Sequence, residues 1–303
     1  SAAKPVSTYA PALDNGTING ASVIDDYPML LNGEVWPRNA NWRYQGLTAL
    51  HTAIAQSLNT CAVRTNLAYG VSNSYDFLVD KLGFENLTYT DSQQVGNMAL
   101  GGFEKGVTTE EMAAAYAAFV NEGVYTKPRT FIRVEDANGN VVLENEAQST
   151  VAMKNTTAAI INHLLQEAAL NGTGYEAQFS GMHIAGKTGS TNSNNDRYFV
   201  GYTPYYTAAV WVGYDTPTRI VASGNPAATL WKTFMSKVHE GLPNKDFDVS
   251  SADMVSVTVC TQTGLLASAG CPSQTVKVAK DYAPSLSCDG HISVTVCADS
   301  GML

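Results

Sequence analysis

The stretch IAGKTGSTNSNNDRYFVGYTPYYTAAVWVGYD, residues 184–215, decides the fold class of this chain. It alternates apolar and aromatic runs with polar turn residues, which is typical of short strands in an antiparallel sheet. A Thr-Pro pair separates two of the runs and favours a turn there. We therefore predict three successive strands, at residues 183–186, 196–203 and 206–214.

Helical patterns lie on both sides of these strands. Apolar residues at helical spacing, or runs of alanine, predict two short helices within 47–69 and single helices at 110–121, 156–170 and 227–240. Residues 1–12 begin another helix, whereas residues 13–46 are rich in Asn, Asp, Gly and Pro and are predicted to be loop. Strands late in the chain, a helical block and a closing helix predict an α/β (α+β) fold, with an antiparallel sheet and a helical subdomain.

Local signals add detail to this outline. Thr108 and Thr109 both precede the helix that ends near residue 121, and both are candidates for its N-cap. The sequence DANGN at residues 136–140 lies between two apolar segments and predicts a β-hairpin.

Length, composition and charge limit the functions open to the chain. Its 303 residues include 45% hydrophobic and 15% charged side chains, which is ordinary for a globular protein. The formal net charge of −9 and the lack of a basic run argue against nucleic acid as a partner. No apolar run approaches the roughly 18–20 residues that cross a bilayer, and no secretory signal opens the chain. Any export signal or membrane anchor is therefore expected to lie outside this sequence.

The last fifth of the chain differs in composition from the rest. SVTVCTQTGLL at residues 256–266 and SVTVCADSGML at residues 293–303 are near copies, so this segment contains an internal repeat. It also holds four of the five cysteines, which are Cys260, Cys271, Cys288 and Cys297. We predict a main domain at 1–245 and a Cys-rich repeat tail at 246–303, and we expect the natural chain to continue past the second copy.

Ser1 and Lys4 form the first of three short motifs with chemical meaning, a Ser-x-x-Lys. On a helix, residues three apart share a face, so the lysine amine is expected to reach the serine hydroxyl. A serine is a poor nucleophile until a base takes its proton, and a lysine made neutral by burial or by a neighbouring cation is such a base. This is the only Ser-x-x-Lys in the chain.

Ser57 and Asn59 form the second motif, a Ser-x-Asn. The serine hydroxyl is expected to relay a proton between the lysine and a leaving group. The asparagine amide is expected to hydrogen-bond the base or a substrate amide. Taken alone, a capping or surface serine is the commoner explanation of such a pattern.

The third motif is Lys187-Thr188-Gly189, on a predicted strand and followed by Ser190. A cation at 187 is suited to hold a substrate carboxylate and to depress the pKa of the lysine in the first motif. Gly189 permits a close approach of backbone or substrate, and a strand edge at Ser190 presents an N–H to an oxyanion. The stretch also matches a phosphate-binding Gly-x4-Gly-Lys-Thr loop, but that loop requires a following helix, and strands are predicted here.

The order Ser-x-x-Lys, Ser-x-Asn, Lys-Thr-Gly is the motif set of penicillin-binding proteins and serine β-lactamases. Longer segments resemble class A penicillin-binding proteins in particular, from residue 1 to about residue 242. These segments are SAAKPVSTYAPALDNG at 1–16, ALHTAIAQSLNTCAVR at 49–64, ALGGFEKGVTTEEMAAAYAAFVNEGVY at 99–125 and the stretch at 184–215. Members of that family join a membrane anchor and a glycosyltransferase domain to a transpeptidase domain. The resemblance implies the penicillin-binding transpeptidase fold, here with a small C-terminal appendage.

The resemblance implies a role for each residue of the first two motifs. Ser1 attacks the carbonyl of a D-Ala-D-Ala stem peptide, and Lys4 accepts its proton. Ser57 and Asn59 help to move protons and hold the substrate amide.

It also implies roles for the third motif. Lys187 and Thr188 position the terminal carboxylate, assisted by the hydroxyl of Ser190, and the N–H groups of Ser1 and Ser190 form the oxyanion hole. D-Ala then leaves, and an amine from a neighbouring peptidoglycan strand attacks the acyl-enzyme. A β-lactam mimics D-Ala-D-Ala and acylates the same serine.

The function implied is a peptidoglycan D,D-transpeptidase that needs no cofactor and no metal at its site. It is expected outside the cytoplasm, held by a membrane anchor that lies, like the glycosyltransferase domain, upstream of this sequence. The Glu-x-x-Leu-Asn of class A β-lactamases is absent from the chain, which favours a transpeptidase over a β-lactamase. A non-catalytic β-lactam or muropeptide sensor, acylated without turnover, is the alternative.

The position of Ser1 raises a further expectation. Strands that precede the nucleophile in the family are not in this sequence, so the resemblance implies a transpeptidase domain without its N-terminal strands. An ammonium at Ser1 in place of an amide N–H weakens half of the oxyanion hole. An N-terminal nucleophile hydrolase, in which the α-amine is the base, is the other explanation of a serine in this place.

The cysteines lead to two predictions. Cys61 lies in a helical segment and is expected to be a buried free thiol. The tail cysteines suggest either disulfides or a zinc site, because Cys288-x-x-His291 has the spacing of metal ligands. Since the family works outside the cytoplasm, disulfides are favoured, and Cys260–Cys271 is the preferred pair.

Overall fold

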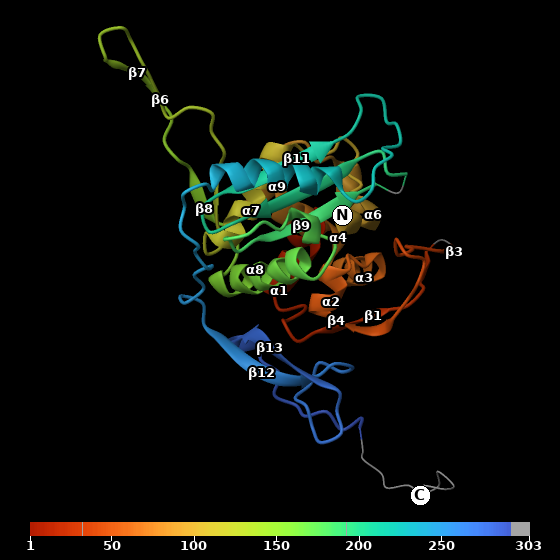
Figure 1. Cartoon of the computed structure of the whole chain (residues 1–303). Helices are drawn as coiled ribbons and strands as arrows, with labels where there is room; N and C mark the ends of the chain where they lie inside the picture. Colours follow the sequence, from red (N-terminus) through yellow and green to blue (C-terminus); the bar gives the residue numbers. More distant parts are fainter. Residues whose placement is uncertain (32, 192, 292–303) are drawn as a thin grey trace, which may run out of the picture.

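A three-stranded antiparallel sheet lies at the centre of the computed structural model, which describes residues 1–31, 33–191 and 193–291. Its strand order is β11-β10-β9 (Figure 1). The strands are β9 (Ala185–Ser190), β10 (Arg197–Tyr202) and β11 (Thr207–Val212). The predicted strands are confirmed, although β9 begins later than expected and continues through the Lys-Thr-Gly motif.

Helix α9 (Pro226–Val238) covers one face of this sheet. Asn225 caps the helix, since its side chain accepts a hydrogen bond from the backbone N–H of Ala227 at 3.0 Å. The fully buried Trp231 packs edge-on against Phe199 of β10, with ring centroids 5.1 Å apart. Aromatic burial of this kind fixes the helix on the sheet.

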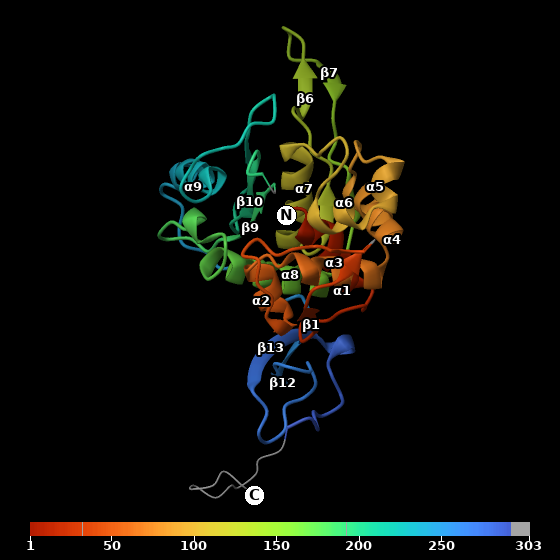
Figure 2. The ribbon, with the colours of Figure 1, turned by 90° about the vertical axis from the view of Figure 1, so that its right-hand side faces the viewer.

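Two long helices, α7 (Thr109–Val120) and α8 (Asn155–Leu170), cover the opposite face. Figure 2 shows the sheet edge-on, between α9 and the larger helical body. The main apolar core lies on the helical side, and it includes the fully buried Tyr116 of α7 and Tyr202 of β10. Helices therefore cover both faces of the sheet, and β9, which carries the Lys-Thr-Gly motif, is buried along most of its length.

The helical body is assembled mostly from short helices. They are η1 (Pro5–Tyr9, a π-helical turn), α1 (Ala10–Asp14), α2 (Leu50–Ala55), α3 (Asn59–Tyr69), α4 (Val71–Asp76), η2 (Phe77–Lys81, also π-helical), α5 (Tyr89–Gln93), α6 (Val95–Leu100) and the single 3₁₀ turn η3 (Tyr175–Ala177). The predicted helix in residues 1–12 and the pair in 47–69 are confirmed. The expected α+β fold with an antiparallel sheet and a helical subdomain is confirmed as well.

The prediction of loop for residues 13–46 is wrong in part. Strand β1 (Val23–Asp26) pairs antiparallel with β4 (Gly46–Ala49), and a small hairpin lies between them. That hairpin joins β2 (Leu30–Leu31) to β3 (Glu34–Val35). The sequence did not predict these strands, because the segment is rich in turn-forming residues. The pairing of β1 depends on a partner strand some twenty residues further along the chain.

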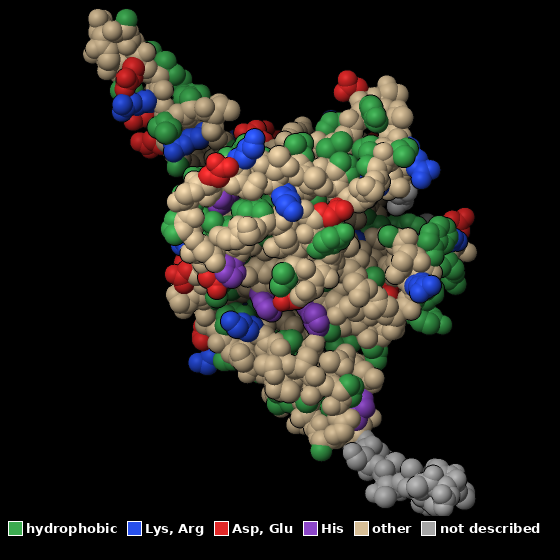
Figure 3. Space-filling model, in the orientation of Figure 1, with side chains coloured by type: hydrophobic (Ala, Val, Ile, Leu, Met, Phe, Trp, Pro, Cys, Tyr) green, Lys and Arg blue, Asp and Glu red, His purple; other side chains and the backbone are tan. Residues whose placement is uncertain are grey.

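Two more strand pairs extend the body beside α7. Strand β5 (Val124–Thr126) pairs with β8 (Ser149–Val151), and β6 (Arg133–Glu135) pairs with β7 (Val141–Glu144). The second pair is the hairpin expected from DANGN. Its residues are exposed on both faces, and the hairpin projects far from the body (Figure 3).

The C-terminal part forms a separate layer beneath the body (Figure 1). Strand β12 (Met254–Cys260) pairs antiparallel with β13 (Ser273–Ala279), and the 3₁₀ turn η4 (Lys280–Tyr282) follows. The predicted boundary at 245/246 falls in the coil between α9 and β12. The second copy of the repeat, with Cys297, lies outside the described residues.

Within the part of the chain that is described, no helix is long and apolar enough to cross a membrane.

Candidate active site

Lys4 joins the first motif to the second. Its side chain lies just before η1 and is only 1% exposed. The Nζ atom donates to the carbonyl of Ser57 at 2.7 Å, to Ser57 Oγ at 3.3 Å and to Asn59 Oδ1 at 2.7 Å. These three acceptors use the full donor capacity of an ammonium. Two motifs that lie more than fifty residues apart in the chain therefore share one buried amine.

Ser1 lies at the start of the same turn. Its backbone nitrogen donates to the carbonyl of Leu100, at the end of α6, at 2.8 Å, and the N–H of Lys4 donates to the Ser1 carbonyl at 3.2 Å. The described residues show no hydrogen bond between the Lys4 amine and the Ser1 hydroxyl, although one was expected. The amine instead donates to Ser57 and Asn59 of the second motif. The Ser1 nitrogen was expected to donate to an oxyanion, but in the structure it donates a hydrogen bond to the carbonyl of Leu100.

Ser57 has an unusual backbone conformation between α2 and α3. Its φ is 59°, in the left-handed region that residues other than glycine rarely adopt. Its N–H donates to the carbonyl of Ile54 at 3.1 Å and closes the end of α2. In this conformation both the carbonyl and the hydroxyl of Ser57 reach Lys4. Such a conformation costs on the order of 1–3 kcal/mol and is typical of functional sites.

Asn59, the first residue of α3, is oriented by a buried polar network. Its backbone N–H donates to Asn39 Oδ1 at 2.8 Å, and its Nδ2 donates to the carbonyl of Arg38 at 2.7 Å. Asn39 in turn donates to Asp26 Oδ1 at 2.7 Å, and Asp26 is fully buried. With Nδ2 held in this way, the side-chain oxygen of Asn59 is aimed at Lys4.

Strand β9 brings the third motif against the start of the first. A Cβ atom on Gly189 would stand 3.0 Å from the backbone nitrogen of Ala2 and 3.1 Å from its Cβ, so glycine allows this approach without a shift of the neighbouring atoms. Tyr116 of α7 holds the other side of Ala2, because its hydroxyl donates to the Ala2 carbonyl at 2.6 Å. Lys187 is 1% exposed, and its Nζ donates to the carbonyl of Thr188 at 3.3 Å.

The polar side chains of the third motif have partners outside it. The hydroxyl of Thr188 lies 2.7 Å from that of Thr173, at hydrogen-bond distance. Ser190 is exposed at the end of β9, and its hydroxyl accepts a hydrogen bond from Arg197 Nη1 at 2.9 Å. Arg197 therefore places a cation beside the position expected to receive the substrate carboxylate.

Burial lowers the pKa of both lysines. The pKa of Lys4 is held well below its usual value, first by burial and then by the positive charge of Lys187. Burial lowers the pKa of Lys187 to about 7. Lowering the pKa of an amine increases its neutral fraction at a given pH, and a neutral amine accepts a proton. The site is thus equipped for general-base chemistry at Lys4.

Several residues of this site were not found from the sequence, namely Asp26, Asn39, Tyr116, Thr173 and Arg197. Asp26 and Asn39 fall in the segment predicted to be loop, where nothing distinguishes them from the other turn residues. Arg197 had a usable signal, because antiparallel pairing of β9 with β10 sets it opposite Ser190.

The cysteines follow the prediction in one case and contradict it in another. Cys61 is free and fully buried, as expected, and burial raises the pKa of its thiol to about 12. The preferred Cys260–Cys271 disulfide is wrong, since both residues are free. Their sulfur atoms instead converge on a common centre with Cys288 and His291.

Comparison with known proteins identifies the family of this arrangement. The model of the penicillin-binding protein transpeptidase domain matches residues 1–236. Penicillin-binding protein 1A of Clostridium acetobutylicum is 34% identical over 258 aligned positions, covering 82% of this chain and 32% of that protein. Its counterpart from Clostridium perfringens is 31% identical over 322 aligned positions, covering 98% of this chain and 38% of that protein. The chain thus spans about a third of the length of these relatives.

Solved structures agree with this assignment. Penicillin-binding protein 1A of Haemophilus influenzae superposes with a TM-score of 0.78 at 24% identity, over 95% of this chain and 48% of that one. The penicillin-binding protein PonA1 of Mycobacterium tuberculosis gives 0.70 at 25% identity, over 82% and 70% of the two chains. The first of these likenesses concerns the fold alone, while the family model and the clostridial relatives cover most of the sequence. The chain therefore belongs to the penicillin-binding protein transpeptidase family.

Proposed function

We propose that this chain is the D,D-transpeptidase part of a peptidoglycan synthase, that it works through a serine acyl-enzyme, and that β-lactams inhibit it covalently. One observation carries the proposal. The buried amine of Lys4, with its lowered pKa, bonds Ser57 and Asn59 and lies one helical turn from Ser1. This arrangement supports the proposed roles of Ser1 as nucleophile, Lys4 as base and Ser57 as proton relay.

Acylation begins when Ser1 Oγ attacks the carbonyl carbon of the penultimate D-Ala and its proton passes to neutral Lys4. Lys4 gives up one of its contacts with Ser57 to reach the Ser1 hydroxyl. The tetrahedral intermediate then collapses, the C–N bond breaks, and the proton reaches the departing amine through the Ser57 hydroxyl. The products of this half-reaction are an ester on Ser1 and free D-Ala.

Substrate orientation falls to the third motif and its neighbours. The terminal carboxylate of the stem peptide pairs with the cations of Lys187 and Arg197, and the hydroxyl groups of Thr188 and Ser190 hydrogen-bond to it. The N–H of Ser190, at the exposed end of β9, donates to the developing oxyanion. An amine of a second stem peptide then attacks the ester, and Lys4 removes its proton. As the C–O bond to Ser1 breaks, Lys4 returns this proton to Ser1 Oγ, and the products are a new amide and the free serine.

The partners of the whole protein are part of the proposal. Peptidoglycan stem peptides are the substrates, and β-lactams are the inhibitors. An upstream glycosyltransferase domain and a membrane anchor hold the domain outside the cytoplasm. Support comes from the relatives named penicillin-binding protein 1A, of which this chain matches about a third.

Intact-mass spectrometry after incubation with benzylpenicillin tests the nucleophile. We expect one adduct per chain, mapped to Ser1, in the original chain and in the control Ser72→Ala, which changes an exposed serine of α4. The adduct is expected to be absent in Ser1→Ala. An adduct that persists in Ser1→Ala, or a well-folded chain that is never acylated, would overturn the proposal.

A second assay separates a transpeptidase from its alternatives. Incubation with an acyl-D-Ala-D-Ala peptide and an acceptor amine is expected to release D-Ala and to give the cross-linked product. Acylation by penicillin without any D-Ala release would favour the muropeptide sensor instead. Rapid release of hydrolysed penicillin, with no cross-linking, would identify a β-lactamase.

A further inference from the structure

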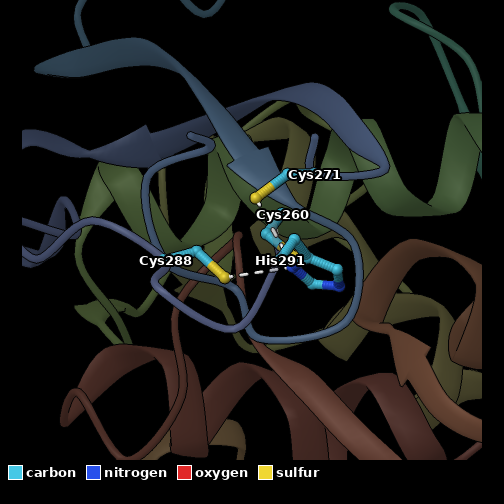
Figure 4. A group of neighbouring side chains, drawn as sticks. All are labelled: Cys260, Cys271, Cys288 and His291. Atoms are coloured by element: carbon cyan, nitrogen blue, oxygen red, sulfur yellow. Dashed lines mark hydrogen bonds between the residues drawn. The ribbon is translucent and has the colours of Figure 1, made fainter. Parts of the chain in front are cut away.

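Four metal-ligand side chains converge in the C-terminal layer. Their ligand atoms are the sulfurs of Cys260, Cys271 and Cys288 and a ring nitrogen of His291, and these atoms all lie within 4.8 Å of one another. Figure 4 shows the cysteines arranged around the imidazole ring. Cys260 and Cys288 are buried, whereas Cys271 and His291 are partly exposed. All three cysteines are free.

The distances within this cluster fit a tetrahedral metal centre. The Nδ1 atom of His291 lies 3.4 Å from Cys288 Sγ, 3.5 Å from Cys271 Sγ and 3.8 Å from Cys260 Sγ. Zinc bonds of about 2.3 Å to sulfur and 2.0–2.1 Å to nitrogen, at tetrahedral angles, separate the two ligand atoms by about 3.5 Å. The three nitrogen–sulfur distances therefore match those expected around one tetrahedral zinc ion.

The imidazole is oriented as a metal ligand. Its Nε2 lies 2.9 Å from Gln262 Oε1, an oxygen that can only accept, so Nε2 carries the proton of the neutral ring. Nδ1 is then unprotonated, and its lone pair faces the three sulfurs. Metal-bound histidines almost always donate their second ring N–H in this way.

The sulfurs also have the surroundings of metal-bound thiolates. The backbone N–H of Gln262 donates to Cys260 Sγ at 3.4 Å, and that of Ser268 donates to Cys271 Sγ at 3.3 Å. Hydrogen bonds to sulfur stabilise the charged thiolate and hold it in place. Both donors lie in the loop between β12 and β13, which wraps around the cluster.

Separate pieces of backbone deliver the ligands to this point. Cys260 ends β12, and Cys271 precedes β13 by two residues. Cys288 is fixed by a hydrogen bond from its N–H to the carbonyl of Leu266 at 2.8 Å, and His291 follows after two residues. Such a closed set leaves no position for a substrate, which is the mark of a structural site rather than a catalytic one.

The C-terminal layer has a small hydrophobic core, which a bound metal would supplement. Its own buried apolar cluster consists of Val259 and Val278 together with Ala21 of the body. So small a core supplies little hydrophobic stabilisation, and small units of this kind are commonly held by disulfides or by a metal. A disulfide between any two of the cysteines requires sulfurs about 2 Å apart and would leave the third cysteine and His291 without a partner.

We propose that Cys260, Cys271, Cys288 and His291 bind one Zn²⁺ ion, which holds the C-terminal layer together. The site departs from the disulfide expected for an extracytoplasmic protein, and it is independent of the proposed transpeptidase chemistry. Three thiolates and one neutral imidazole give a centre of net charge −1. Cys297, outside the described residues, is not required to complete the ligand set.

Metal analysis of the purified full chain tests the proposal. After reconstitution with Zn²⁺ under reducing conditions and removal of excess metal, we expect one zinc per chain by native mass spectrometry and elemental analysis. Replacement by Co²⁺ is expected to give intense visible bands of tetrahedral coordination together with sulfur-to-cobalt charge transfer. A chain that retains no zinc and gives no such spectrum would overturn the proposal, whatever its variants do.

Variants assign the ligands. Cys288→Ser and His291→Gln are expected to weaken zinc retention at least tenfold in competition with a chelator, because each removes a ligand. Cys61→Ala and Cys297→Ser, which change cysteines outside the set, are expected to retain one zinc. If a ligand variant fails to fold, the cobalt spectrum of the original chain still shows sulfur coordination. The site would be contradicted if chain isolated without reductant carried a Cys260–Cys271 disulfide and the same chain, once reduced, failed to bind zinc.

Discussion

At the scale of single residues, the proposed chemistry of the site depends on how often the amine of Lys4 is neutral. Its three oxygen partners favour the charged form, while burial and the positive charge of Lys187 oppose it. The opposing influences prevail, and the pKa lies well below that of a lysine in water. Acylation is thus expected to rise with pH as Lys4 loses its proton, and to level off once it is neutral.

Replacing Lys187 by glutamine tests this balance. The change removes one cause of the lowered pKa at Lys4, so that pKa rises, and the rising limb of the acylation rate moves to higher pH. Burial, the larger cause, remains, so the limb stays below the range of an ordinary lysine. The second-order rate of acylation by penicillin, followed against pH, measures the midpoint, and Lys105→Gln on the exposed surface is the control. A limb that stays in place, or moves to lower pH, would rule out Lys4 as the base.

The three sequence motifs supplied the candidate catalytic residues. Ser1, Lys4 and Lys187 were named from the sequence because the proposed chemistry demands those residue types at those spacings, and their catalytic roles stay predictions. A hydrogen bond from Lys4 to Asn59 was among the predicted alternatives, but the contact of Lys4 with both the carbonyl and the hydroxyl of Ser57 was not predictable. It depends on the left-handed backbone at Ser57, and no local signal in the sequence specifies that conformation.

At the scale of secondary-structure elements, local sequence patterns predicted those helices and strands that are stabilised mainly by local interactions. The hairpin of β10 and β11 follows from alternation and a turn, and α7 follows from its apolar spacing and cap. The pairing of β1 with β4 was missed, because a short strand made of turn-forming residues is stabilised by its partner and by burial. Asp26, which ends β1 and anchors the network behind Asn59, was missed with it.

Helix α7 offers a test at this scale, since two threonines were candidates for its cap. The hydroxyl of Thr108 accepts from the N–H of Glu111 at 3.0 Å, and the Glu111 carboxylate accepts from the N–H of Thr108 at 2.8 Å. Thr108→Ala breaks this capping box and is expected to cost about 1 kcal/mol of unfolding free energy. Thr109→Ala, one residue inside the helix, is expected to be neutral or slightly stabilising. Urea unfolding distinguishes them, and equal losses would show that the cap contributes nothing.

At the scale of the whole molecule, the C-terminal layer contacts the body away from the site. Lys154, the residue before α8, donates to the carbonyl of Asp14 at 2.8 Å and to the hydroxyl of Tyr282 at 3.0 Å. Gly264 and Gly20 lie where the layer meets the segment between α1 and β1. That segment connects α1 to β1, which ends at Asp26, whereas the three side-chain hydrogen bonds that Lys4 makes within the described residues go to Ser57 and Asn59 of the body.

The substitution Gly20→Ala tests whether the body and the C-terminal layer are energetically coupled. The added Cβ would stand 2.3 Å from the carbonyl oxygen of Lys277, so the layer must shift, at a cost of about 1–3 kcal/mol. We expect faster proteolysis in the coil at 239–253, with the acylation rate by penicillin nearly unchanged. The control is Gly102→Ala, whose Cβ would meet its nearest neighbour at an ordinary 3.7 Å. If acylation fell in step with the loss of protection, the body and the C-terminal layer would form one cooperative unit, and the proposed division near residue 245 would be wrong. If only proteolysis changed, the layer would be an appendage that docks on the transpeptidase without supporting its site.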